Sequence, residues 1–331
     1  MKKIFPSFVL LFLFQNIIAQ NIVTVADNIA SSFRGLSVVN NKILWVSGSN
    51  GTVGKSVDGG QSWKWMTIKD FEKNDFRDIE AFDKNTAIVM AVGEPAYILK
   101  TKDGGENWNV VFKDETPGMF LDAMEFWNDQ SGIVIGDPIN NRFFIARTFD
   151  GGDTWQTIPE THKPMAGSGE ACFAASGTNI RKLGKAEAVF VSGGLSSNIF
   201  IRDKKISLPI LHGTSSTGAN SIAIRNKKIM IVVGGNFTKK DEIEKNCAIT
   251  SDGGLTWISP AVSPSGYRSC VEYLGKNKWI TTGLNGLDIS EDDGMNWRNI
   301  SSESYHVCRK AKKGDAVFFA GNGKVGKLVK E

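Results

Sequence analysis

Ser56-Val57-Asp58-Gly59-Gly60-Gln61-Ser62-Trp63 is the first of five similar octapeptides that decide the fold of this chain. The other four occupy residues 101–108, 148–155, 250–257 and 290–297. All five read Ser/Thr-x-Asp-(Gly/Asp)-Gly-x-(Ser/Thr/Asn)-Trp. Successive copies begin 40 to 47 residues apart, except for one interval of 102 residues. The long interval fits two repeats, one of which carries an eroded copy that we place at residues 199–204.

A second periodic feature indicates the number of repeats. Short apolar runs end in glycine seven times, with a mean spacing of about 45 residues, at Gly48, Gly93, Gly136, Gly193, Gly234, Gly283 and Gly321. Repeats of this length, built from short strands and glycine-rich turns, are typical of a β-propeller. The sequence therefore predicts an all-β, seven-bladed propeller with one four-stranded sheet per repeat.

The second repeat shows the expected strands, at residues 76–82, 86–93, 96–102 and 107–112. The last repeat, residues 305–329, supplies only three. We expect residues 21–25 to provide the fourth strand of that blade, so that the N-terminal strand closes the ring and removes its free sheet edges.

The octapeptide falls between the third and fourth strands of a blade and is interpreted as a structural turn. Its Ser/Thr hydroxyl and Asp carboxylate can accept backbone N–H groups, and its glycine permits a positive φ. A motif that recurs around a ring cannot converge on one catalytic site. We therefore assign a structural role to the conserved position of the motif, at Asp58, Asp103, Asp150, Asp252 and Asp292, and we place the tryptophans in the core.

The N-terminus has the form of a secretory leader. Met1-Lys2-Lys3 precedes an apolar run over residues 4–14, and Ala19 is the expected cleavage site. The run is too short for a stable membrane helix. We thus predict a signal peptide at 1–19, a single propeller domain at 20–331, and a periplasmic or extracellular location. Export permits disulfides, but we expect Cys172, Cys247, Cys270 and Cys308 to be free packing residues.

Composition excludes several functions. The formal net charge is only +4, which argues against a nucleic acid partner or an anionic membrane surface. No dinucleotide-binding fingerprint leads from a strand into a helix, and we predict no cofactor. The three histidines, His162, His212 and His306, match no metal-binding spacing, so no metal site is predicted.

Individual polar residues gather at the strand ends on the face opposite the octapeptide turns. Neighbouring strands alternate in direction, so this face carries the starts of first strands and the ends of second strands. The candidate ligand- or partner-binding residues there are Arg34, Arg77, Asp78, Asp122, Asp137, Glu170, Arg268 and His306. They form either a network that holds the blades together or a binding site at the mouth of the central channel.

The octapeptide is the Asp-box, or BNR repeat, and with one degenerate copy in seven the chain resembles secreted bacterial relatives of the photosystem II stability/assembly factor family. Further stretches that match that group are residues 33–36, 75–79, 136–138, 169–177 and 266–269. The resemblance implies a non-enzymatic function in assembling or stabilising another protein. We expect a binding module whose polar central face contacts a protein or glycan.

The alternative is a carbohydrate-active enzyme, a glycoside hydrolase or lyase, that uses carboxylates on the same face. Asp122, Asp137 and Glu170 are the catalytic candidates. Arg34, Arg77 and Arg268 with a tyrosine supply the residue types of a sialidase, but Phe33-Arg34-Gly35 departs from the Phe-Arg-Ile-Pro signature of that family. No Gly-x-Ser-x-Gly motif indicates a serine hydrolase.

Overall fold

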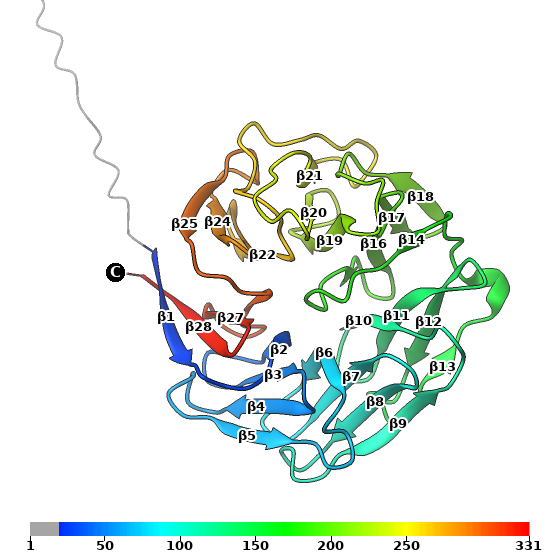
Figure 1. The fold of residues 1–331 in the computed structure, drawn as a ribbon, viewed down its shortest axis with the longest axis vertical. Helices are drawn as coiled ribbons and strands as arrows, with labels where there is room; N and C mark the ends of the chain where they lie inside the picture. The colour runs from blue at the N-terminus through cyan, green and yellow to red at the C-terminus, as the bar shows by residue number, and fades with distance from the viewer. Residues whose placement is uncertain (1–19, 331) are drawn as a thin grey trace, which may run out of the picture.

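Seven successive groups of antiparallel strands stand around a common axis in the computed structural model, which describes residues 20–330 (Figure 1). The predicted leader lies outside the described residues. We number the strand groups as blades I to VII in chain order. This arrangement confirms the predicted all-β propeller and is consistent with seven blades.

The first three blades each contain four strands. Blade I consists of β2 (Phe33–Val38), β3 (Leu44–Gly48), β4 (Thr52–Ser56) and β5 (Lys64–Thr67). Blade II consists of β6 (Asp75–Ala81), β7 (Ala87–Val92), β8 (Ala96–Thr101) and β9 (Asn109–Asp114). Blade III consists of β10 (Leu121–Phe126), β11 (Gly132–Ile139), β12 (Arg142–Thr148) and β13 (Gln156–Thr157).

The next three blades are less uniform. Blade IV has a divided first strand and consists of β14 (Glu170–Ala171), β15 (Ile180–Lys182), β16 (Ala188–Gly194), β17 (Asn198–Ile201) and β18 (Lys204–Ser207). Blade V consists of β19 (Thr217–Ile224), β20 (Met230–Asn236) and β21 (Cys247–Thr250). Blade VI consists of β22 (Cys270–Gly275), β23 (Lys278–Gly283), β24 (Gly286–Ser290) and β25 (Arg298–Ser301). A bridge between Ile249 and Ile258 stands where blade V would have a fourth strand.

Blade VII closes the ring. It consists of β26 (Val307–Lys310), β27 (Val317–Gly321), β28 (Lys324–Lys330) and β1 (Gln20–Ala26). The N-terminal strand β1 pairs with β28 from Gln20↔Lys330 to Ala26↔Val325, which confirms the predicted seam. Both described ends of the chain therefore lie in one sheet (Figure 1).

The Asp-box turns have the structural role that the sequence predicts. In the third copy, the Thr148 hydroxyl donates to the Asp150 carboxylate and accepts the Gly152 N–H, each at 2.8 Å. The second oxygen of Asp150 accepts the Thr154 hydroxyl at 2.6 Å. These hydrogen bonds lower the pKa of Asp150 to about 2, against an opposing effect of burial. The other four copies repeat the contacts.

Thr148→Val is expected to lower the free energy of unfolding by about 1–2 kcal/mol, because the buried Gly152 N–H would lose its acceptor. Urea denaturation measures the change. Thr157→Val, at an exposed position on β13, is the matched control and should change stability little. Equal losses in both variants would contradict a structural role for the box hydroxyl.

The eroded repeat in blade IV differs in a defined way. Only Arg202 and Asp203 connect β17 to β18. Ile201, the last residue of β17, pairs directly with Lys204, the first residue of β18. Arg202 adopts a φ of 58°. The octapeptide is thus replaced by a two-residue hairpin, which needs no side-chain hydrogen bonds to hold a longer turn.

Apolar side chains fill the spaces between blades. Trp45 of blade I is fully buried and meets Trp108 of the second Asp-box edge-to-face, with ring centroids 6.4 Å apart. All four cysteines are buried and free, as predicted. Within residues 20–330 the helical structure is one short 3-10 turn, η1 (Glu160–His162). No helix in that range has the length and apolar character needed to cross a membrane.

Candidate functional site

A loop segment occupies the central channel. Residues 172–179, which we call the plug, separate β14 from β15 and project into the middle of the ring (Figure 1). Five of the other blades, I, III, V, VI and VII, contact the plug through hydrogen bonds. These are Arg34 to the Ala175 carbonyl at 3.3 Å, the Cys172 N–H to Asp137 at 2.8 Å, Thr178 to Ser221 at 2.6 Å, Ser176 to the Ser269 carbonyl at 2.7 Å, and Arg309 to the Gly177 carbonyl at 3.0 Å.

The plug packs closely against blade II where Gly177 lies beside the Asp78 carboxyl group. Gly177 has a φ of 60°, and a Cβ at this position would lie 2.3 Å from the Asp78 carboxyl group. The Asp78 oxygens accept the N–H groups of Ile79 and Met124, each at 2.8 Å. Burial raises the pKa of Asp78 to about 7, although Arg309 and the two N–H donors oppose the shift. Asp78 thus joins blade II to blade III beneath the plug.

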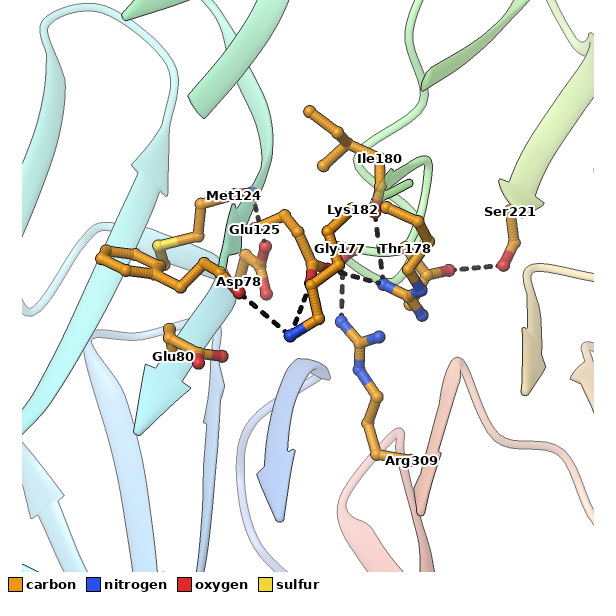
Figure 2. A network of polar contacts seen from close by, with 12 residues as sticks. Asp78, Glu80, Met124, Glu125, Gly177, Thr178, Ile180, Lys182, Ser221 and Arg309 are labelled. Carbon is orange, nitrogen blue, oxygen red and sulfur yellow. Dashed lines mark hydrogen bonds and ion pairs between the residues drawn. The ribbon is translucent and has the colours of Figure 1, made fainter. Parts of the chain in front are cut away.

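On the Asp-box side of the plug the channel widens into a cavity of about 1020 Å³. We call it the lower cavity. It is lined by the final residues of the first strands and by the turns that follow them, from all seven blades. Figure 2 shows this region, with Arg309 pointing toward Gly177 and with Glu125 and Lys182 nearby.

Ion pairs between blades line the lower cavity. Arg181 lies 3.6 Å from Glu125 of blade III and 3.5 Å from Glu272 of blade VI. Lys312 lies 2.5 Å from Glu80 of blade II. Burial raises the pKa of Glu125, and the nearby Arg181 and Arg309 counteract part of that shift. The lining as a whole contains eight basic and five acidic side chains, so the cavity favours an acidic ligand.

Five of the predicted site residues lie on the other side of the plug, at the upper mouth. They are Arg34, Arg77, Asp122, Asp137 and His306. Asp137 accepts the Cys172 N–H of the plug at 2.8 Å, and burial raises its pKa to about 6. Burial, together with the charges of Arg34 and Arg77, lowers the pKa of His306 to about 3. Its ring is therefore neutral at physiological pH.

Asp122 is the most unusual of these side chains. It is completely buried, and neither oxygen has a hydrogen-bond partner of good geometry among the described residues. Burial raises the pKa of Asp122 well above its usual value, and the charge of Asp137 adds to the shift. Arg77 and the Ala174 N–H oppose it.

Two predicted site residues lie inside individual blades, apart from the channel mouth. Arg268 pairs with Asp288 on β24, with its Nε 2.6 Å from Oδ2, and both side chains are fully buried. The Glu170 carboxylate accepts from Ser192, Asn198, Gly167 and Lys205. A third residue, Asp78, lies midway along the channel against the plug. The eight residues therefore do not form one cluster.

These positions bear on the enzyme alternative. The Glu170 carboxylate is already bonded to four donors, and it lies in blade IV rather than beside Asp122. The three catalytic candidates therefore do not surround one open site. Within residues 20–330, no group of three or more His, Cys, Asp or Glu side chains is arranged to hold a metal ion.

Sequence reasoning missed the lower cavity and the residues that shape it, Glu125, Arg181, Glu272 and Arg309. They lie near the ends of first strands, on the face opposite the strand ends at which the sequence predicts a site. A signal was present, because blades II, III, IV, VI and VII each carry a charged residue near the end of the first strand. In a propeller these ends also converge on the axis.

The fold and its plugged channel define a β-propeller of the BNR type. Comparison with protein families places a match over residues 19–121, with the family described as photosynthesis system II assembly factor YCF48. The chain therefore resembles that family over about its first third. A comparison with curated proteins finds no match.

Solved structures support the same fold. A YCF48 structure bound to a D1 peptide is 19% identical, with a TM-score of 0.67, and the alignment covers 96% of this chain and 97% of that one. YCF48 from Cyanidioschyzon merolae is 15% identical, with a TM-score of 0.65 and coverage of 93% and 98%. A streptogramin B lyase is 14% identical, with a TM-score of 0.66 and coverage of 94% and 98%. Identities this low show a shared fold and leave the chemistry open.

Proposed function

We propose that this chain is a non-catalytic binding protein, similar in kind to an assembly factor, that holds a segment of a protein partner in the lower cavity. The observation that carries the proposal is the cavity itself, a space of about 1020 Å³ with converging charged groups from separate blades. A cavity of this size accommodates several residues of an extended polypeptide. The likeness to YCF48, one structure of which holds a peptide, supports a protein ligand.

The charges on the cavity define the partner further. Arg181 and Lys312 are paired with carboxylates and Arg309 donates to the Gly177 carbonyl, whereas Lys227 and Lys313 lie exposed at the rim. An acidic segment would meet these rim lysines first, and their charge would increase its rate of association. A partner segment rich in Asp or Glu therefore fits best. The upper mouth, where the sequence predicted the contact, holds the plug through Arg34 and Asp137.

Charge reversal tests this assignment. We expect Lys227→Glu/Lys313→Glu to weaken binding of the partner roughly tenfold or more, because two attractive charges at the rim become repulsive. The partner is captured from the envelope fraction with the mature protein, and a labelled peptide from its acidic segment is titrated by fluorescence anisotropy. A preparation from the native host whose N-terminus is Gln20 would support the proposed export.

Lys239→Glu/Lys240→Glu is the matched control, because these exposed lysines lie in the loop after β20, at the upper end of blade V, and the net charge changes equally. It should bind like the wild type. Equal loss in both double variants, or loss in the upper-face variant alone, would refute binding in the lower cavity. A captured glycan in place of a protein would refute the proposed partner class.

A further inference from the structure

Two cysteines from neighbouring blades lie side by side near the axis. Cys270 begins β22 of blade VI, and Cys308 lies on β26 of blade VII. Their Sγ atoms are 3.6 Å apart, and the residues are 38 positions apart in the sequence. Both side chains are fully buried. The other two cysteines have different neighbours, since Cys172 contacts the Val191 carbonyl and Cys247 interacts with Trp297.

The surroundings of Cys270 favour its reaction. Its sulfur accepts the Cys308 N–H at 3.4 Å, and the Thr178 hydroxyl of the plug donates to it at 3.7 Å. Burial opposes ionisation of the thiol. The hydrogen bonds from Cys308 and the charge of Arg309 outweigh burial and lower the pKa of Cys270 to about 6. The thiolate is the form of cysteine that attacks a disulfide.

We propose that Cys270 and Cys308 form a disulfide that links blade VI to blade VII. The oxidant is a disulfide of the glutathione or thioredoxin class. The Cys270 thiolate attacks one of its sulfurs and releases one thiolate, which gives a mixed disulfide. The Cys308 thiolate then attacks the Cys270 sulfur and releases the second thiolate. Overall, two protein thiols lose two electrons and two protons, and one external disulfide becomes two thiols.

The geometry requires only a small movement. The two sulfurs must approach from 3.6 Å to the bond length of about 2.05 Å. The strands that carry them are adjacent, because the N–H of one cysteine already donates to the sulfur of the other. The predicted leader would deliver the chain to a compartment where disulfide exchange takes place.

The link would reinforce a specific part of the ring. Blade VII is closed by the hydrogen-bonded seam between β1 and β28, which has no covalent support. Glu272 of blade VI and Arg309 of blade VII both line the lower cavity, and each lies within two residues of a linked cysteine. A disulfide would therefore hold the two walls of the cavity at a fixed separation.

Thiol mapping of the mature protein tests the proposal. One sample is equilibrated as the folded protein in a buffer of oxidised and reduced glutathione, and a second is refolded from the reduced, unfolded chain in the same buffer. Each is quenched with acid, unfolded, alkylated and digested for mass spectrometry. We expect one cross-linked peptide pair, Cys270 with Cys308, and alkylated Cys172 and Cys247. The plug covers Cys270, so the link should form faster during refolding than in the folded protein.

Stability provides a second measurement. The linked protein should melt roughly 5 °C or more above the reduced protein, because the link restricts a loop of 38 residues in the unfolded chain. Cys308→Ala should abolish the difference, and Cys172→Ala should retain it. Four free thiols in both samples, or a cross-link that involves Cys172 or Cys247, would overturn the proposal.

Discussion

Arg268→Met is expected to destabilise the protein by about 3–5 kcal/mol, one of the two largest effects that we anticipate from a single substitution. The Arg268 side chain is fully buried and pairs with Asp288, which is also fully buried. Removal of the guanidinium would leave the Asp288 carboxylate without its charged partner. Urea or thermal unfolding of the purified variant measures the loss.

The remaining contacts of the pair allow a sharper test. Asp288 also accepts the Ser265 hydroxyl at 2.6 Å, and Arg268 donates to the Asn285 amide oxygen at 2.5 Å. Arg268→Met/Asp288→Asn should recover part of the stability, since the charge left by the single substitution is then absent. Arg298→Met, at an exposed position on β25, is the control and should cost little.

Retention of full stability with loss of partner binding in Arg268→Met would contradict this assignment. It would return Arg268 to the binding role that the sequence suggested. Arg268, two residues before β22, pairs with Asp288 on β24 of the same blade, so its effect on binding is expected to follow its effect on folding. Binding measured below the melting transition separates the two.

The fold could be predicted from the sequence because the octapeptides and the glycine-ended apolar runs recur at a regular spacing along the chain. The strands expected in the second repeat, such as residues 76–82 and 96–102, lie within one or two residues of β6 and β8. The pairing of β1 with β28 followed from a missing strand in the last repeat. Both predictions used spacing alone, and spacing is what a ring of similar blades constrains.

The site could not be predicted in the same way, because spacing does not determine where a side chain points. Arg77 and Asp78 are adjacent, yet a register shift in β6 between Phe76 and Asp78 aims them differently. Arg77 pairs with Asp75 at the upper mouth, whereas Asp78 faces the plug. Arg268 looked like a channel residue until its partner on β24 was known.

The plug shows a second limit. In the sequence, residues 169–171 look like the start of a first strand similar to the others. The strand β14 has only two residues, and the chain then leaves the sheet until β15 begins at Ile180. The intervening segment is buried by residues from several blades that are distant in the sequence. Its position therefore depends on tertiary contacts that no local pattern records.

The buried carboxylates should make the protein more stable in mild acid than at neutral pH. Burial raises the pKa of Asp78 to about 7 and of Asp137 to about 6, and it raises the pKa of Asp122 and Glu125 as well. The folded state then binds more protons than the unfolded state above about pH 4, so stability falls as the pH rises toward 7. The Asp-box carboxylates act in the opposite direction, because their lowered pKa values stabilise the folded state above about pH 4 and this stabilisation is lost as the pH falls toward 2.

Asp122→Asn is expected to raise the melting temperature by several degrees at pH 8, because the amide carries no charge into a fully buried site that lacks good hydrogen-bond partners. The gain should shrink as the pH falls toward 4, because the wild-type carboxyl is then protonated in the folded state and increasingly protonated in the unfolded state, where it resembles the amide. Thermal unfolding from pH 4 to pH 8 measures both. Asp129→Asn, at an exposed position, should follow the wild-type curve.

Two results would contradict this structural interpretation of Asp122. If Asp122 were catalytic, a glycan screen would show turnover that Asp122→Asn abolishes. A constant difference across the pH range would refute the assignment of the effect to the charge on Asp122.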